Sequence, residues 1–362
     1  MKANIITIPG DGIGPEVVAE AVRLLDIIAN KFGHEFKYSE QLMGGCSIDK
    51  HGVALTDEAL ADCKASDAVL LGAVGGPKWD DPNAKVRPEQ GILALRKGLG
   101  VFANLRPAKP HPALFDSSPL KPEKLKGVDV LVIRELTGGL YFGHKAREKV
   151  NGHTRAIDTL EYHDYEVERV VNLAFRLAAG RRKKVSSVDK ANILESGRLW
   201  RQIASGIAAE HPDITFEHVL VDTAAMRLVN APASFDVLVT ENMFGDILTD
   251  EASMLAGSLG LLPSASLGAA LNSIGQPRGL YEPIHGSAPD IAGQDVANPL
   301  ATILSVALLL RYSLAQPQAA EGVENAVASV LAEGLRTADI QQPGTRQVGC
   351  REMGAAVLCH LE

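Results

Sequence analysis

Three aspartates carry the most specific chemistry in this sequence of 362 residues. Asp246 and Asp250 lie four residues apart, so on a helix they share a face, where two like charges repel each other by roughly 0.2–0.5 kcal/mol unless a cation lies between them. Asp222 follows an apolar segment and could supply a third ligand oxygen. An all-oxygen ligand set suits Mg²⁺ or Mn²⁺ and not zinc. A solvated acidic face is the alternative, and the spacing alone favours it.

Three arginines next to apolar sequence, Arg96, Arg106 and Arg134, could bind an anion. A guanidinium presents a planar fork that holds a carboxylate through two parallel hydrogen bonds. Taken one at a time, such arginines are more often found in surface ion pairs. Tyr141 lies among glycines, which permit close approach of the backbone, and it could be either a proton donor or a core residue.

Four apolar segments that are typical of buried strands end in charged or strongly polar residues. In parallel α/β sheets, ligands bind outside the carboxyl ends of the strands. Because four strands end in this way, with charges of both signs, a charged pocket is a better explanation than a chance occurrence of polar loop residues. The segments are Val128–Ile133, Val185–Val188, His218–Val221 and Phe235–Thr240, followed by Arg134-Glu135, Asp189-Lys190, Asp222 and Glu241-Asn242.

The elements that must position these residues alternate between strands and helices. Ala3–Ile8 and Ala68–Leu71 are two further candidate strands, and Glu16–Asn30 and Glu166–Ala179 carry the apolar stripe of an amphipathic helix. This alternation predicts an α/β fold. At roughly 150 residues per domain, the length predicts two domains, or three.

The glycine-rich turn Gly10–Glu16 looks at first like a dinucleotide-binding fingerprint. The pattern G-x-G-x-x-G needs glycine where this chain has Pro15, and no acidic partner follows about 20 residues later on a second strand. A classical Rossmann fold is therefore not expected. What remains is a tight turn into a helix that begins at Pro15, and such a turn can also approach an anion or a cofactor.

Two segments interrupt the alternation of strands and helices. Lys149–Ile157 contains the dipeptide Asn151-Gly152 and predicts a β-hairpin, which could be an exposed flap or an arm that pairs with another subunit. Glu282–Gly293 is a long polar loop of a kind that is usually functional. Asn298-Pro299 then opens the apolar helix Leu300–Leu310.

Composition and motifs exclude several classes of protein. The net charge is 36 − 44 = −8 and aromatic residues make up only 5%, so a nucleic acid is not expected as a partner. No apolar run approaches the ~20 residues of a membrane span. The four cysteines form no C-x-x-C pair and no secretory signal is apparent, so reduced thiols and a cytoplasmic location are expected. Hydrolase and P-loop motifs are absent.

Several long motifs together resemble the β-decarboxylating dehydrogenases, the family of isocitrate and isopropylmalate dehydrogenases. The resemblance runs from Pro9–Glu16 to Gly349–Gly354 and covers nearly the whole chain. It implies a two-domain α/β fold with a mostly parallel sheet flanked by helices. Residues 1–101 and 257–362 would form a discontinuous cofactor-binding domain, and residues 102–256 a domain for substrate, metal and dimerisation. The motifs are Gly91–Arg96, Phe102–Pro107, Val132–Gly139, Asp189–Asn192, Thr240–Asp250 and Glu282–Gly293.

The resemblance also implies roles for the charged residues. Arg96, Arg106 and Arg134 match the family's clamp for the two carboxylates of the substrate. Lys190 and Tyr141 match its acid–base pair. Lys190 is the candidate base for the substrate's hydroxyl proton, and Tyr141 would protonate carbon after CO₂ has left.

Metal binding and assembly are implied in the same way. Asp222, Asp246 and Asp250 match the family's ligands of Mg²⁺ or Mn²⁺, and Asp222 would also contact the substrate. In this family the counterparts of Lys190 and Asp222 reach the site from the partner subunit. A homodimer with shared active sites is therefore expected, with the hairpin near residues 149–163 as its intersubunit arm.

The cofactor that the resemblance implies is NAD. Asp290 falls where the family binds the adenosine ribose, and a carboxylate accepts hydrogen bonds from a ribose 2′-hydroxyl but repels a 2′-phosphate. NAD is therefore expected rather than NADP. The residues expected to contact it are Ile13, Glu89, Asn192, His285, Gly286, Ser287, Ala288, Asp290, Ile291 and Asn298.

The expected substrate carries an isopropyl group. Ile92 and Leu93, with Ile193 from the partner, would line an apolar pocket for this group. The third carboxylate of isocitrate would be buried in this pocket without an ion-pair partner, which is costly, and Glu89 would repel that carboxylate. The expected reaction is the oxidative decarboxylation of 3-isopropylmalate to 4-methyl-2-oxopentanoate and CO₂, in leucine biosynthesis. A sister dehydrogenase for tartrate, D-malate or homoisocitrate remains an alternative. A non-catalytic anion-binding relative is disfavoured, because the acid–base pair and the three aspartates are intact.

Overall fold

The computed structural model describes residues 1–81 and 84–361. The chain divides into two compact units, which we call unit 1 and unit 2. Unit 1 comprises Met1–Val101, His111–Pro119 and Ala256–Glu362, and unit 2 comprises Phe102–Pro110 and Leu120–Leu255. Unit 1 therefore combines the two ends of the chain, and unit 2 is built from its middle.

The strands of unit 1 form a mostly parallel arrangement. Neighbours pair in parallel except β12 and β11, which are antiparallel. β3 is buried along its whole length, as expected for a strand that is covered on both faces. The order is β2 (Glu35–Glu40), β1 (Lys2–Gly10), β3 (Ala68–Ala73), β12 (Pro277–Pro283) and β11 (Pro263–Leu271).

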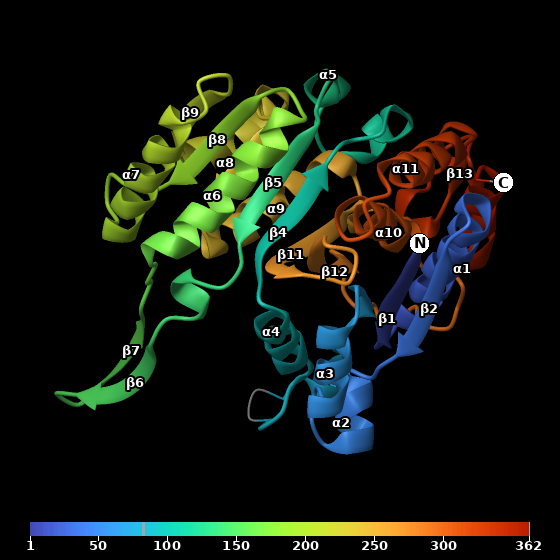
Figure 1. Ribbon diagram of the computed structural model, residues 1–362, viewed down its shortest axis with the longest axis horizontal. Helices are drawn as coiled ribbons and strands as arrows, with labels where there is room; N and C mark the ends of the chain where they lie inside the picture. The colour runs from blue at the N-terminus through green and yellow to red at the C-terminus, as the bar shows by residue number, and fades with distance from the viewer. Residues whose placement is uncertain (82–83, 362) are drawn as a thin grey trace. The chain divides into compact units, whose positions relative to one another are not determined.

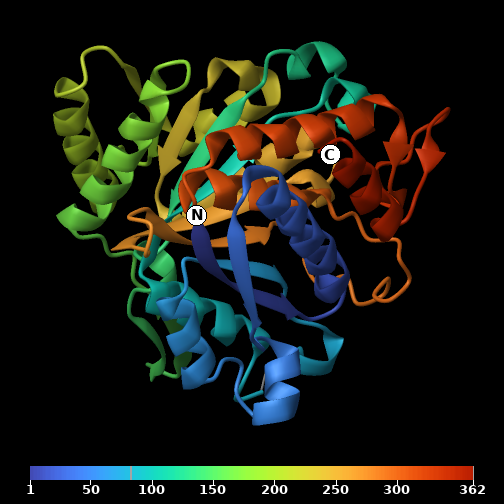
Figure 2. The same ribbon diagram turned by 45° about the vertical axis from the view of Figure 1, so that its right-hand side comes forward.

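Helices pack against these strands. α1 (Gly14–Phe32) has Pro15 in its first turn and ends where Gly33 adopts a left-handed conformation, and it contacts β1, β3 and α10 (Leu300–Tyr312). Figure 2 shows α1 in blue beside the red C-terminal helices. The remaining elements of unit 1 are α2 (Gly45–His51), α3 (Asp57–Ala65), α4 (Pro88–Leu99), α11 (Pro317–Ala332), α12 (Cys350–Cys359), the short 3-10 helices η1 (Pro77–Trp79), η2 (Pro112–Ser117), η5 (Leu259–Leu261) and η6 (Ala338–Ile340), and the paired strands β13 (Leu335–Arg336) and β14 (Arg346–Gln347).

Unit 2 has a second mostly parallel set of strands. β4 and β5 are antiparallel, and the other neighbours are parallel. α6 packs against β5, β8, β10 and α7 (Figure 1). The strand order is β4 (Val101–Ala108), β5 (Val130–Glu135), β10 (Val237–Thr240), β8 (Lys184–Asp189) and β9 (Thr215–Leu220). The helices are α5 (Pro122–Leu125), α6 (Asp164–Ala179), α7 (Glu195–Ala209), α8 (Val221–Asn230), α9 (Asn242–Ala256), η3 (Gly139–Tyr141) and η4 (Pro232–Ser234).

The predicted hairpin is confirmed. β6 (Lys145–Val150) and β7 (His153–Asp158) pair in antiparallel fashion around Asn151 and Gly152. Both of these residues have positive φ, at 51° and 84°, as a tight two-residue turn between twisted strands requires. Most of the hairpin is exposed, and Figure 1 shows it extending away from the strands of unit 2.

The α/β prediction is confirmed, but one expected strand end is wrong. β9 stops at Leu220, and Asp222 lies in the first turn of α8 rather than at the end of a strand. The apolar Val221 fits either element, and the helix formers that follow it, Ala224 and Ala225, favour the helix. The loop expected from Glu282 also starts later, because Glu282 and Pro283 belong to β12.

Two further expectations concern cysteines and membrane spans. All four cysteines are free thiols. Among residues 1–81 and 84–361, no helix combines the length and the hydropathy that a membrane crossing needs.

Candidate active site

The predicted metal-binding aspartates lie on α9, which begins directly after β10. Asn242, Asp246 and Asp250 are spaced one turn apart and so share a face of this helix. The side chains of Asp246 and Asp250 are 39% and 71% exposed, so their oxygens are accessible to a ligand. Two accessible carboxylates on one helix face are a donor set that a hard divalent cation can use.

Arg134, near the end of β5, is the most enclosed of the predicted clamp residues in unit 2, with only 5% of its surface exposed. Its Nε and Nη2 atoms donate to Asn242 Oδ1 at 3.0 and 2.8 Å, and its Nη1 atom donates to Asp246 Oδ1. Its stem lies against α9 at Gly245, where a Cβ atom would come within 2.5 Å of the arginine Cγ. Glycine at 245 therefore lets the helix approach the arginine.

Tyr141 ends the short helix η3 and points at the same aspartate. Its hydroxyl donates to Asp246 Oδ2 at 2.7 Å, and the Arg134 guanidinium lies 5.7 Å from its ring centroid. Partial burial and the hydrogen bond to Asp246 raise the pKa of Tyr141 to about 12. The phenol is therefore protonated at neutral pH, as a proton donor has to be.

Arg106 on β4 joins this group one turn further along the same face of α9. Its Nε atom donates to Asn104 Oδ1 at 2.8 Å and its Nη1 atom to Thr249 Oγ1 at 2.7 Å, while Nη1 lies 3.5 Å from Asp250 Oδ1. Unit 2 thus brings Arg106, Arg134, Tyr141 and the two α9 aspartates into one connected cluster.

Lys190 and Asp222 form an ion pair of their own in unit 2. Lys190 follows β8, and its Nζ atom lies 3.1 Å from Asp222 Oδ1 in the first turn of α8. The hydrogen bond from Lys190 lowers the pKa of the Asp222 carboxyl below its usual value. Asn192 and Ile193 lie on the exposed turn after Lys190.

The remaining predicted substrate residues lie in unit 1, on α4. Glu89, Ile92, Leu93 and Arg96 follow the i, i+3, i+4, i+7 pattern of a single helix face. Arg96 Nη2 donates to Glu282 Oε1 at 2.8 Å, and both side chains are largely buried, at 17% and 9% exposed. The clamp residue of α4 is therefore held by a carboxylate from β12.

The predicted cofactor residues of unit 1 meet where the Gly10–Ile13 turn contacts the Ile284–Asn298 loop. The Ile13 amide donates to Ser287 O at 2.8 Å. Gly12 has φ +59°, and a Cβ atom there would lie 1.9 Å from the same oxygen. Ile13 also shares an apolar cluster with Ala288 and Ile291. Close backbone packing therefore sets the position of this loop.

Other polar residues of this loop differ in their partners. Gly286 and Asp290 are exposed. His285 Nε2 is shielded from solvent and has no hydrogen-bond partner in the described part of the chain, and burial lowers the pKa of this histidine. Asn298 Oδ1 accepts from the Leu300 amide and its Nδ2 donates to Asp339, so this side chain helps to begin α10.

Several residues of these sites were not assigned a role from the sequence. Asn104 and Asn242 bind the two clamp arginines of unit 2, and Glu282 binds the third in unit 1. Asn104 could have been found, because it lies two residues before Arg106 and so on the same face of a strand. Nothing in the local sequence pairs Arg96 with Glu282, 186 positions away.

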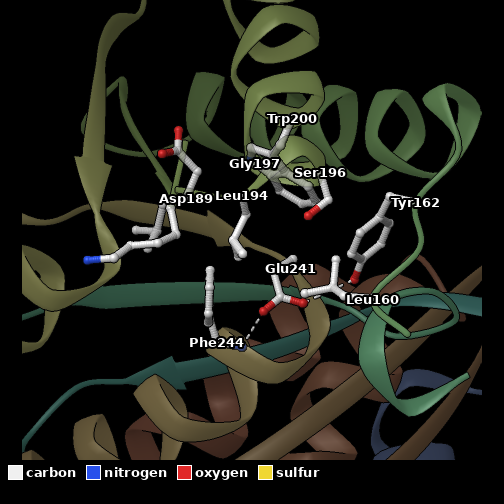
Figure 3. A pocket seen from close by; sticks show the side chains of 11 residues that line it. Leu160, Tyr162, Asp189, Leu194, Ser196, Gly197, Trp200, Glu241 and Phe244 are labelled. Carbon is white, nitrogen blue, oxygen red and sulfur yellow. Dashed lines mark hydrogen bonds between the residues drawn. The ribbon is translucent and has the colours of Figure 1, made fainter. Parts of the chain in front are cut away.

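Glu241, which the sequence placed at a charged strand end, has a structural role. Its carboxylate accepts from the amides of Met243 and Phe244 at 3.1 and 2.8 Å and so caps the first turn of α9. Burial raises the pKa of Glu241. Glu241 is one of the residues that line a small pocket of unit 2, and Figure 3 shows it there with Tyr162, Trp200 and Asp189.

Comparison with known proteins identifies the family of the chain. Residues 4–357 match the family described as isocitrate/isopropylmalate dehydrogenase. A 3-isopropylmalate dehydrogenase from Anaeromyxobacter dehalogenans is 67% identical over 94% of this chain and 95% of the relative, and one from Geobacillus kaustophilus is 56% identical over 97% and 93%. A solved isocitrate dehydrogenase from Methylococcus capsulatus has a TM-score of 0.85 at 33% identity, covering 99% of both chains. The chain therefore belongs to the isocitrate/isopropylmalate dehydrogenase family, a family of oxidoreductases.

Proposed function

We propose that this protein catalyses the NAD-dependent oxidative decarboxylation of 3-isopropylmalate to 4-methyl-2-oxopentanoate and CO₂, a step of leucine biosynthesis, in the cytoplasm. The observation that carries the proposal is the cluster of two arginines, a tyrosine and two aspartates on β4, β5, η3 and α9. The names of relatives more than half identical over nearly the full chain support the same substrate.

The arginines bind and orient the substrate in this proposal. Arg106 and Arg134 hold carboxylates through their guanidinium forks, and Arg96 of α4 contributes a third cation. Fixing both carboxylates aligns C2 and C3 of the substrate for reaction, because orientation supplies a large part of the rate enhancement of a bound reactant.

Two residues move protons. The amine of Lys190 takes the proton from the C2 hydroxyl, and the Tyr141 hydroxyl gives a proton to C3 after the C3 carboxylate has left as CO₂. Tyr141 is supported in this role because its hydroxyl already donates a hydrogen bond within the cluster.

The cofactors are a divalent cation and NAD. Asp246 and Asp250, with Asp222, supply only oxygen ligands, which fits Mg²⁺ or Mn²⁺. The Gly10–Ile13 turn and the Ile284–Asn298 loop fit NAD, because His285 Nε2 lacks a partner in the described part of the chain and the Asp290 carboxylate is accessible. When bound, the cation would polarise the oxygen at C2 and NAD⁺ would accept the hydride.

The active unit that we propose is a homodimer in which Lys190 and Asp222 of one subunit serve the site of the other. Exposed apolar side chains at spacings of one and two helical turns support an interface on α8 and α9. The exposed hairpin β6–β7 supports a second interface, in which it would serve as an arm that pairs with the other subunit. The exposed apolar residues are Met226 and Val229 on α8 and Ile247 and Met254 on α9.

The substrate preference follows from α4. Ile92 and the exposed Leu93 lie one turn before Arg96, so an aliphatic group on C3 of the substrate would meet apolar side chains. Steady-state kinetics with 3-isopropylmalate, D-malate and isocitrate test this. We expect kcat/KM to be at least about tenfold higher for 3-isopropylmalate, since a buried branched alkyl group contributes about 1.5–3 kcal/mol. Equal values for D-malate would refute the apolar pocket.

A further inference from the structure

Each of the two clamp arginines in unit 2 is held at its Nε atom by the amide oxygen of a buried asparagine. Arg106 Nε donates to Asn104 Oδ1 at 2.8 Å, and Arg134 Nε donates to Asn242 Oδ1 at 3.0 Å. Asn104 and Asn242 are each only 1% exposed. An acceptor at Nε fixes the rotation of the guanidinium plane about the end of its side chain, because the five N–H donors form one rigid fork.

The fold places these four residues together. Asn104 and Arg106 are two positions apart on β4 and so face the same side of the strand. Asn104 is directly opposite Arg134 in the antiparallel register of β4 and β5. Asn242 is the first residue of α9, which follows β10, the other neighbour of β5 (Figure 1).

The choice of an amide is unusual within unit 2. An amide oxygen accepts a hydrogen bond without bringing a negative charge, so it orients a guanidinium and leaves its positive charge for a substrate anion. A carboxylate at the same place would orient the arginine equally well but would neutralise it. Other arginines of unit 2 do have buried carboxylate partners: Arg169 with Glu135, Arg181 with Asp236 and Arg201 with Asp189.

We propose that Asn104 and Asn242 are positioning residues that orient Arg106 and Arg134 for the substrate carboxylates without neutralising them. The inference rests on the function proposed above. Asp246 and Asp250 also contact these arginines, but both are assigned to the cation, so the asparagines are the partners whose neutrality the site depends on.

Asn242 has an additional task. Its Nδ2 atom donates to Gly138 O at 3.0 Å, and its backbone amide donates to the Tyr162 hydroxyl at 2.9 Å. Gly138 precedes η3, which carries Tyr141. Asn242 therefore ties the orientation of Arg134 to the turn of the proton donor, so a substitution there will change kcat as well as KM. Asn104 offers the cleaner test of charge.

The test compares Asn104→Asp with Asn104→Ala by steady-state kinetics with 3-isopropylmalate and NAD⁺ in the presence of Mg²⁺. Asn104→Asp keeps the size and an acceptor oxygen toward Arg106, replaces the amide NH₂ by a second oxygen and adds a negative charge. We expect it to raise KM for 3-isopropylmalate at least about tenfold, as much as Asn104→Ala or more, with KM for NAD⁺ and kcat within about threefold. Asn172→Asp, on the exposed face of α6, is the matched control and should leave KM unchanged.

A purely structural role gives the opposite ranking. If orientation alone mattered, Asn104→Asp would restore it and resemble the wild type, while Asn104→Ala would be impaired; that ranking overturns the proposal. Should Asn104→Asp fail to fold, Asn242→Asp makes the same comparison at Arg134, and a wild-type KM there overturns the proposal equally. A wild-type protein that does not oxidise 3-isopropylmalate refutes the proposed function itself, which is a separate outcome.

Discussion

The candidate substrate site of unit 2 and the candidate cofactor loop of unit 1 are held by different kinds of interaction. In unit 2, carboxylates meet side-chain donors, as Asp246 does with Arg134 and Tyr141. In unit 1, carboxylates near the loop meet backbone amides: Asp11 accepts from Gly45, Cys46 and Gly75 at 2.7–2.8 Å, and Glu16 accepts from Gly293 and Asp295.

This difference predicts how each region responds to substitution. Where function depends on side-chain charge, removing one group should cost activity and leave the fold. Where the backbone sets the geometry, adding a single methyl group should displace the loop and weaken the binding of its ligand. Two substitutions test this contrast directly, and two with smaller expected effects compare what a carboxylate contributes to stability in each unit.

Lys190→Ala should lower kcat by roughly 10²–10⁴-fold, the range typical for loss of a general base. NAD⁺ binding, followed by calorimetry, should stay within about threefold of the wild type. Lys183→Ala is the control, because Lys183 also pairs with an aspartate, Asp213, at the same distance of 3.1 Å. An active Lys190→Ala enzyme would remove Lys190 from its assigned role.

Gly12→Ala should raise KM for NAD⁺ at least about tenfold and change kcat at saturation much less. The reason is steric, since the new Cβ atom would lie 1.9 Å from Ser287 O at a φ of +59°, and such strain typically costs about 1–3 kcal/mol. Gly322→Ala on α11, where the nearest atom is 3.7 Å away, is the control. Equal KM values for NAD⁺ in both variants would contradict the claim that close backbone packing in unit 1 sets NAD⁺ binding.

Glu217→Gln should destabilise the protein by about 1–2 kcal/mol at pH 7 after allowance for solvent screening. Burial opposes ionisation of this residue on β9, but hydrogen bonds from Arg227, Ser186 and Lys184 lower its pKa from 4.5 to about 2. A lowered pKa stabilises the fold above pH 4.5, and that contribution is lost as the pH falls toward 2. Urea unfolding at several pH values should therefore show that the difference in free energy of unfolding between Glu217→Gln and the wild type shrinks as the pH falls. A difference that does not change with pH would contradict this prediction.

Glu20→Gln in unit 1 should have the smallest effect and the opposite sign. Burial raises the pKa of Glu20 above 4.5 despite its ion pair with Arg23 at 2.7 Å. Its charged form is therefore penalised at pH 7, and glutamine should be neutral or stabilising by less than about 1 kcal/mol. The difference should vanish as the pH falls toward 4.5. Thermal unfolding of both proteins at pH 7 and pH 4.5 measures it, and a clear loss of stability at pH 7 would count against the account.

How far the sequence predicted the site depends on how local each feature is. The shared face of Asp246 and Asp250 and the turn at Asn151-Gly152 follow from periodicity and turn chemistry within a few residues, and both are as expected. Asp222 was expected at a strand end and lies on α8, because a short apolar segment does not distinguish a strand end from a first helical turn.

Features that depend on tertiary pairing were out of reach of the local sequence. Strand β4 contains Pro107 and was expected only as a motif, yet its register with β5 sets Asn104 opposite Arg134. The acceptors of the clamp arginines come from different strands and from a helix start. Sequence patterns identified the charged groups themselves, but not the neutral residues that orient them.

The most direct test of the central claim is NADH formation by the purified protein with 3-isopropylmalate and Mg²⁺, with CO₂ measured in parallel. The account predicts equal amounts of NADH and CO₂, loss of both on addition of EDTA, and recovery with excess Mg²⁺ or Mn²⁺. NADH formation that EDTA does not affect would contradict the assignment of Asp222, Asp246 and Asp250, and no NADH at all would contradict the proposed reaction.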